Sequence, residues 1–300
     1  MVILSAMTTT TIMQIISALS YGLYAFLVGG LLLGFHRKIL ARVHGRPGPP
    51  ILQYIINVFK FYIKEITFPI TSANPLYLSV ALMDLMVWLS ALFVAVVFNY
   101  SLLIIVGLYV LQKIVEHGCG LSSGSPYGKI GGVRSVFSAA AEVPLFAVVG
   151  IIFILTNSLL VGDILNYQAI NGPLLFKLPL AAFAFFVLLV SKAPTSPFSI
   201  VKDKATVSGY ITEHYGTLES IILMSDAIAW FVLLWLFIAL FIGPVIIMSP
   251  ILTLIGMTIL TFIISMICAT TPLLTPNHSV MIQILIASLT IIDLLYRATH

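Results

Sequence analysis

Three carboxylic acids stand inside long apolar stretches of the sequence: Asp84, Glu142 and Asp226. An ionised carboxylate in hydrocarbon costs several kcal/mol, so such residues normally face a bundle interior or a water-filled path. An apolar site also favours the protonated form, which suits a group that takes up and releases protons. A single such carboxyl could equally be held protonated for packing. Three in one small bundle favour an ion or proton pathway.

Two further acids precede Asp226 and could extend that pathway to the surface. Glu213 and Glu219 lie in or beside the polar segment before the apolar stretch that holds Asp226. Glu219 and Asp226 are seven residues apart, which places them two helical turns apart on one face. The two glutamates are therefore predicted to begin a route from the cytoplasmic surface. Glu116 stands at the corresponding end of another apolar stretch.

The other reactive residue types form no pattern typical of a metal, haem or nucleotide site. Cys119 and Cys268 are far apart and form no CxxC pair, so neither a disulfide framework nor a zinc or iron–sulfur site is indicated. The six histidines lie near span ends, in loops or at the terminus, and are interpreted as surface or interface residues. The glycine-rich residues 128–132 lack a phosphate-binding motif. We expect this chain to bind no cofactor or metal of its own.

The composition predicts that membrane-spanning helices hold these residues. Of the 300 residues, 60% are hydrophobic and only 8% are charged, and the mean hydropathy is +1.15. A soluble domain carries roughly a quarter charged residues. Only helices or closed barrels satisfy their backbone groups in a bilayer, and long apolar runs favour helices. The predicted fold class is all-α: one polytopic transmembrane domain over residues 1–300.

About eight spans are predicted, because roughly 20 apolar residues cross a hydrocarbon core of roughly 30 Å. No signal-peptide pattern precedes the first apolar stretch, so it is expected to remain as a helix. The spans lie near Ile12–Phe35, Pro75–Val97, Tyr100–Val115, Ser135–Asn157, Leu174–Val190, Leu218–Ile242, Val245–Cys268 and Ser279–Leu295.

A different kind of segment follows the first span. Residues 51–65 place Asn57, Lys60 and Lys64 on one helical face and apolar residues on the other. This pattern predicts an amphipathic helix lying in the membrane interface. A tilted continuation of the second span is the alternative.

Basic residues set the predicted orientation. If the N-terminus is outside, 12 of the 14 lysines and arginines lie at the inner face, all but Lys177 and Arg297. The positive-inside rule then places both termini outside the cell membrane. The larger connections, residues 36–74, 116–134 and 191–217, would face the cytoplasm. Because the charges sit between spans, no nucleic-acid partner is expected.

The first inner connection carries a specific motif. It reads ARVHGRPGPPILQ at residues 41–53 and continues to Lys60 and Lys64-Glu65. This segment resembles the inner loop and amphipathic helix of the NuoH-type subunit shared by respiratory complex I and membrane-bound nickel–iron hydrogenases. The branch of hydrogenases and formate hydrogenlyases is the more similar, because its members read alike around the GP and LQ pairs.

Two later segments resemble the same family. One reads GSPY at residues 124–127, followed by Ile130-Gly131, Arg134 and the sequence EVPL from Glu142. The other has Pro197-Phe198, then TEHYG at residues 212–216, with Asp226 ten residues on. With the first motif, the resemblance covers residues 34 to 226, and the predicted number of spans agrees with it.

The resemblance implies an anchor role. In this family the subunit is the membrane-embedded part of the complex to which a soluble electron-transfer module binds. Its buried carboxylates link that module to antiporter-like membrane subunits. The implied soluble partners resemble a hydrogenase large subunit and an iron–sulfur protein, which hold the iron–sulfur clusters and, in some complexes, a nickel–iron site. Residues matched at the docking surface are Arg42, Arg46, Gln53, Lys60 and Arg134, and those matched in the transfer path are Glu142, Glu213 and Asp226.

One loop departs from the family pattern. The family is typically acidic after the fifth span, but here Ser199 replaces an aspartate, and Lys202 and Lys204 stand where two glutamates are expected. Either the usual proton entry is absent, or a partner supplies matching acids and the two lysines belong to the docking surface. The altered loop also suggests a divergent complex that reduces sulfur compounds.

Two other functions remain open from the residues alone. A free-standing ion-coupled transporter would use Asp84, Glu142 and Asp226 as ion sites, and a structural scaffold would give them no ionic role. The sequence shows no inverted repeat with matched interrupted spans, a common feature of secondary transporters. With the docking motifs, this favours a subunit of a larger complex that moves protons or sodium ions.

Overall fold

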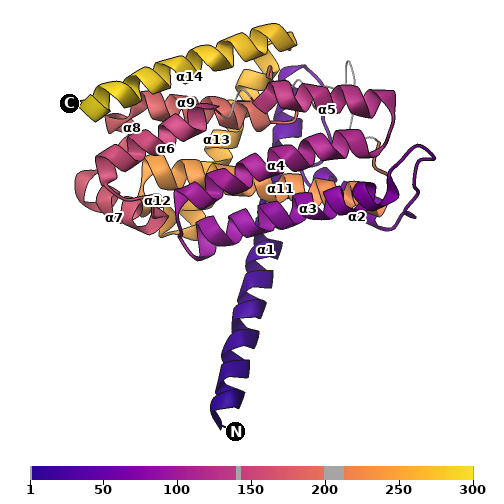
Figure 1. Cartoon of the computed structure of the whole chain (residues 1–300), viewed down its shortest axis with the longest axis horizontal. Coiled ribbons are helices and arrows are strands. Elements are labelled where there is room, and N and C mark those ends of the chain that lie inside the picture. The colour runs from indigo at the N-terminus through magenta and orange to yellow at the C-terminus, as the bar shows by residue number, and fades with distance from the viewer. Residues whose placement is uncertain (1, 140–142, 199–212, 300) are drawn as a thin grey trace.

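The computed structural model describes residues 2–139, 143–198 and 213–299, with side chains from residue 19 onward. Almost all of the described chain is helical (Figure 1). The helices are α1 (Val2–Val43), α2 (Gln53–Tyr62), α3 (Asn74–Leu92), α4 (Leu102–Ser122), α5 (Pro126–Ser138), α6 (Val143–Thr156), α7 (Val161–Asn171), α8 (Leu174–Lys177), α9 (Pro179–Lys192), α11 (Thr217–Phe237), α12 (Pro244–Ile247), α13 (Pro250–Thr270) and α14 (Pro276–Thr299). Two π-helical turns, η1 (Phe93–Val97) and η3 (Ile238–Ile242), extend α3 and α11.

Seven stretches of the described chain are long and apolar enough to cross a membrane by length and composition. They match seven of the predicted spans and confirm the all-α polytopic fold class. The predicted fifth span, Leu174–Val190, is a broken helix, because α8 ends at Lys177 and α9 begins at Pro179. Proline can begin a helix but not continue one without loss of a hydrogen bond. Helix α9 is apolar but shorter than the other spans.

Helices extend further into two of the predicted inner loops than the sequence interpretation placed them. Helix α1 runs on to Val43, and α4 runs to Ser122 before α5 begins. Ser125 caps α5 by accepting a hydrogen bond from the N–H of Tyr127 at 3.2 Å, and Pro126 fits the first turn. The polar residues in these segments therefore continue or cap helices instead of breaking them.

The predicted amphipathic helix is confirmed as α2. Tyr54, Ile55 and Val58 are buried on the side that packs against α1 and α11. Ile56 and Phe59 are exposed on the other side. An exposed apolar face beside lysines suits a helix in the membrane interface.

Helix α11 is the centre of the bundle. Its neighbours include α1, α2, α3, α9 and α13, and 78% of its most apolar window is buried, against 50% or less in the other six long spans. Helices α3, α4 and α11 run side by side, whereas α1 crosses them and projects from the body (Figure 1). Gly29 permits this crossing, because a Cβ there would overlap the carbonyl oxygen of Ala227 on α11.

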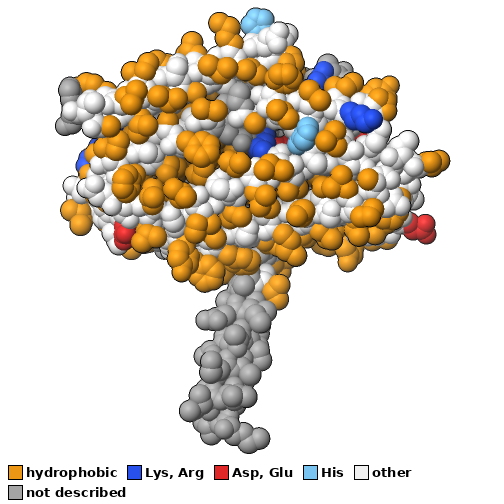
Figure 2. Space-filling model, viewed as in Figure 1, with side chains coloured by type: hydrophobic (Ala, Val, Ile, Leu, Met, Phe, Trp, Pro, Cys, Tyr) orange, Lys and Arg blue, Asp and Glu red, His pale blue; other side chains and the backbone are white. Residues whose placement is uncertain are grey.

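Many large hydrophobic side chains are exposed on the surface. Hydrophobic side chains cover most of the face shown in Figure 2, and charged side chains on it are few. Large exposed apolar residues lie on every long span, for example Leu23, Met86, Leu103, Phe262 and Ile292. A soluble protein rarely exposes such continuous apolar surface, so the outer faces of these helices suit contact with lipid or with other membrane subunits.

Candidate functional site

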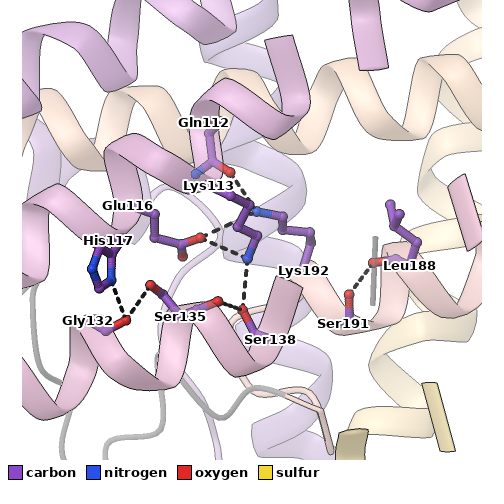
Figure 3. Close-up of polar contacts among 10 residues, drawn as sticks. All are labelled: Gln112, Lys113, Glu116, His117, Gly132, Ser135, Ser138, Leu188, Ser191 and Lys192. Atoms are coloured by element: carbon purple, nitrogen blue, oxygen red, sulfur yellow. Dashed lines mark hydrogen bonds and ion pairs between the residues drawn. The ribbon is translucent and has the colours of Figure 1, made fainter. Parts of the chain in front are cut away.

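The best-defined group of charged side chains joins α4, α5 and α9 (Figure 3). Glu116 on α4 is only 4% exposed, and its Oε2 lies 2.9 Å from Nζ of Lys113 one turn earlier. Nζ of Lys192, at the end of α9, lies 3.9 Å from the same oxygen. Lys113 also donates a hydrogen bond to Oγ of Ser138 on α5 at 2.9 Å. Lys113 and Lys192 therefore approach one buried carboxylate from two helices, and Ser138 of a third helix fixes Lys113. We name Glu116, Lys113, Lys192 and Ser138 the Glu116 cluster.

Further contacts fix the ammonium group of Lys192. Its Nζ donates to Oε1 of Gln112 at 2.9 Å and lies 5.0 Å from the ring centroid of Tyr109. A cation over an aromatic face is attracted by the ring quadrupole. Among the described residues, two ammonium groups thus lie close to one buried carboxylate. A further carboxylate near these lysines would be attracted to them.

Asp226 is the candidate for that second carboxylate. It is half-buried on α11 and lines a small cavity that Gln112 and Lys192 also line. The charge of Asp226 also acts on Tyr54 of α2. Burial raises the pKa of Tyr54 well above its usual value, the negative charge of Asp226 raises it further, and Arg37 opposes the shift. Tyr54 therefore stays neutral at ordinary pH and keeps its hydroxyl proton.

Glu213 lies where the segment before α11 meets α3 and the start of α5. Its carboxylate accepts a hydrogen bond from Oγ of Ser125 at 3.2 Å, and its backbone carbonyl accepts one from the hydroxyl of Tyr77 at 2.6 Å. The next residue, His214, is fully buried and stacks on the ring of Tyr77 with 4.3 Å between centroids. These contacts attach the segment before α11 to α3 and to the start of α5.

The remaining predicted acids lie on the central helices. Asp84 on α3 is 5% exposed, as expected for an acid that faces the bundle interior. Glu219 lies in the first turn of α11 and is half-buried. Because α11 is a regular helix from Thr217 to Phe237, Glu219 and Asp226 lie on one face, as their spacing predicts.

The residues matched to the docking surface differ in exposure. Arg42 and Arg46 at the end of α1 and Lys60 on α2 are exposed, which suits contact with a partner. Gln53 and Arg134 are half-buried, so both also pack within the chain. Docking by the first three therefore requires no rearrangement of the bundle.

Some predicted site residues lie outside the described residues. They are Glu142 of the transfer path and Lys202 and Lys204 of the altered loop. Their roles stay predictions.

The interpretation of the histidines as surface or interface residues was wrong for His214, which is fully buried, and for His36. His36 is fully buried near the C-terminal end of α1, with Nδ1 2.8 Å from Oγ of Ser265 and Nε2 2.9 Å from Oγ1 of Thr195. Ser265 donates its only hydroxyl proton to the carbonyl of Thr261. Ser265 must therefore accept from His36, so Nδ1 carries the proton and Nε2 accepts from Thr195.

The described residues offer little to a metal ion. No group of three or more His, Cys, Asp or Glu side chains within them is arranged to hold one. Cys119 and Cys268 are buried free thiols in separate helices. The arrangement of acids and lysines is suited instead to storing and passing charge, because a buried carboxylate between two cations responds strongly to any change in its neighbours.

Sequence reasoning located Glu116 but not its partners. Lys113 precedes it by three residues, a spacing that pairs side chains on one helix face and was available from the sequence. Lys192 reaches Glu116 from the end of α9, and nothing in the local sequence of α4 or α9 indicates that contact. Gln112 and Trp230, which line the cavity beside Asp226, were missed for the same reason.

Comparison with protein families identifies the chain. A family model described as NADH dehydrogenase matches residues 15–297. The chain belongs to this family. A protein of Methanocaldococcus jannaschii that is provisionally named an NADH-ubiquinone oxidoreductase is 66% identical to it over 284 residues, which covers 95% of this chain and 96% of that protein. Membership of the NADH dehydrogenase family thus extends over nearly the whole chain.

More distant relatives agree with the resemblance to NuoH-type proteins. The H subunit of the NADH-quinone oxidoreductase of a Geobacillus strain is 27% identical over 243 residues, or 75% of this chain and 72% of that protein. A solved structure of the membrane-bound sulfane sulfur reductase, an archaeal respiratory membrane complex, contains a chain of the same fold. That chain has a TM-score of 0.81 and 24% identity, with 93% of this chain and 99% of that chain covered. The NuoH-type assignment of this NADH dehydrogenase family member is confirmed.

Proposed function

We propose that this chain is the membrane-embedded anchor and coupling subunit of a complex I-like respiratory complex. Its membership of the NADH dehydrogenase family and its relatives among the H subunits of NADH-quinone oxidoreductases support this function. In the complex the chain holds the soluble electron-transfer arm and links electron transfer there to movement of H⁺ or Na⁺ in neighbouring membrane subunits. Iron–sulfur clusters, and a nickel–iron site where the complex has one, belong to the soluble partners.

The observation that carries the proposal is the buried set of charges formed by the Glu116 cluster and Asp226. Charges interact far more strongly in a low-dielectric interior than in water. A change of charge or conformation at the docked arm is felt first at Glu213 and Glu219, at the inner end of α11. Asp226, two turns further along, and the Glu116 cluster then adjust their proton and ion-pair partners. Asp84 and Glu142 are proposed to continue the path.

Exposed basic residues support the proposed docking surface. Arg42, Arg46 and Lys60 lie at the inner end of α1 and on α2, and an electrostatically complementary soluble partner would be drawn to them. We place this surface on the cytoplasmic side and both termini outside, because 12 of the 14 basic residues then lie inside. Antiporter-like subunits are proposed to pack against the lipid-facing helices.

A sulfur-compound reductase is the proposed form of the complex. The altered loop with Lys202 and Lys204 departs from the acidic pattern of hydrogenase-type relatives, and the fold is shared with a chain of a sulfane sulfur reductase. We expect the purified complex to reduce polysulfide with reduced ferredoxin. Hydrogen evolution with reduced ferredoxin at a normal hydrogenase rate would contradict this form.

The variant Asp226→Asn tests the coupling function. The amide keeps the shape of the side chain but cannot exchange a proton, so coupled ion transport into vesicles should be abolished. Blue-native electrophoresis should show the complete complex, with its soluble iron–sulfur subunits retained. Asp163→Asn, an exposed acid at the start of α7, is the matched control and should transport normally. Full ion transport by Asp226→Asn would contradict the assignment.

A further inference from the structure

A cavity lies between the Glu116 cluster and Asp226. It offers about 20 Å³ to water-sized molecules. A single buried water needs roughly 10–15 Å³ of such space and two to four polar partners. The lining comes from α1, α3, α4, α9, α11 and the segment after α9, and includes Gln112, Lys192, Asp226, Ala229 and Trp230. The cavity is therefore large enough for one water molecule.

One wall of the cavity supplies a hydrogen-bond donor. Trp230 is 2% exposed, and its Nε1–H has no hydrogen-bond acceptor within the part of the chain that the structure describes. Leaving such a donor buried and unsatisfied costs about 1–3 kcal/mol. The Trp230 ring is one helical turn from Asp226 on α11, so the two residues approach the cavity together. A molecule in the cavity that accepts from Nε1 would remove this cost.

The other wall supplies the charges that such a molecule would bridge. Gln112 lines the cavity, and its Oε1 already accepts from Lys192 at 2.9 Å. Lys192 lines it too, and its Nζ lies 3.9 Å from Glu116. Asp226 completes the lining with the opposite charge. A water that accepts from Trp230 can donate to a carboxylate, so it fits all of these groups in one orientation.

We propose that this cavity binds one structural water molecule that bridges Trp230 and Asp226 to the Gln112–Lys192 pair. The water joins Asp226 to the Glu116 cluster and makes the two acidic groups a single hydrogen-bonded unit. This water site adds detail to the coupling function proposed above. The role of the water in ion transfer rests on that function, whereas the binding of the water does not. Trp230 is then a positioning residue, because it orients the water and does not itself exchange a proton.

A high-resolution map of the assembled wild-type complex tests the binding site directly. We expect one ordered water within hydrogen-bond distance of Trp230 Nε1 and of the Asp226 carboxylate. A dry cavity would overturn the inference. The map does not depend on ion transport, so it tests the water site separately from the coupling function. If the water is present and the Asp226→Asn variant still transports ions normally, the coupling function alone is contradicted.

Two variants test the role of the water. Trp230→Phe keeps an aromatic ring but removes the donor, and Ala229→Val fills the cavity from its wall. Both should lose the water density and slow ion transport roughly tenfold, the effect of about 1.4 kcal/mol from one lost hydrogen bond. Trp235→Phe, the same exchange on the same helix away from this cavity, should keep both. Unchanged transport in Trp230→Phe after loss of the water would overturn the proposed bridge.

Discussion

A buried acid in this chain is held by cations from more than one helix. Glu116 has Lys113 one turn away on its own helix and Lys192 on α9, and Lys192 is in turn fixed by Gln112. Removing water from a charge is expensive, and such groups persist only when partners and hydrogen bonds replace the lost solvation. The Glu116 cluster meets this requirement with two lysines, and Lys192 and Gln112 also line the cavity that Asp226 lines.

Lys192→Met tests that balance. The change removes the cation and its hydrogen bond to Gln112 while keeping most of the apolar stem. We expect the purified complex to lose about 1.5–3 kcal/mol of stability, the value of one hydrogen bond to a charged group. Lys129→Met, at an exposed position of α5, is the control and should leave the melting temperature unchanged. An unchanged melting temperature for Lys192→Met would show that the pair is not important for stability.

His36→Leu tests the hydrogen bond between the buried histidine and Ser265. Leucine leaves the hydroxyls of Thr195 and Ser265 without their ring partner, so the complex should be destabilised by about 1–3 kcal/mol. Thermal unfolding of His36→Leu, Ser265→Ala and the double variant forms a cycle. A non-additive cycle is expected because the two residues are hydrogen-bonded. Additive effects would show that the two side chains do not interact.

At the scale of elements, close helix crossings depend on glycine. Gly29 lies against the backbone of Ala227, so Gly29→Ala should push α1 away from α11 and lower the melting temperature markedly. Gly107→Ala is the matched control: this glycine lies in α4, and a Cβ there meets nothing within 4 Å. Alanine favours helices over glycine by about 1 kcal/mol, so the control should be neutral or stabilising. Equal effects of both changes would contradict the close crossing.

The sequence predicted the existence of the helices better than it predicted where they begin and end. Long apolar runs indicated the spans, and the alternation around Lys60 indicated α2, because both signals are local. The break before Pro179 and the helical segment from Pro126 were not expected, because a proline can end one helix or begin the next. Within the site, the burial of Asp84 followed from its apolar neighbours. Two contacts of the site, Lys192 with Glu116 and His36 with Ser265, depend on which helices pack together. No local sequence pattern predicts that packing.

At the scale of the whole molecule, orientation is the least constrained property and can be measured. Cys119 and Cys268 are buried, so we expect a maleimide to label a single introduced surface cysteine with little reaction at the two native cysteines. Glu65→Cys should react with an impermeant maleimide only from the cytoplasmic side, and Asn171→Cys, at the exposed end of α7, only from outside. The reverse pattern would contradict the proposed orientation and with it the cytoplasmic docking surface.

The central place of α11 has a consequence for how the protein is made. Every helix from α1 to α9 emerges from the ribosome before the one around which several of them pack. At about 5–20 residues per second, synthesis of the preceding 216 residues takes roughly 10–40 seconds. During that interval the earlier helices lack the central helix against which several of them pack. An insertase or chaperone that binds these helices until α11 is inserted would determine how much protein folds correctly.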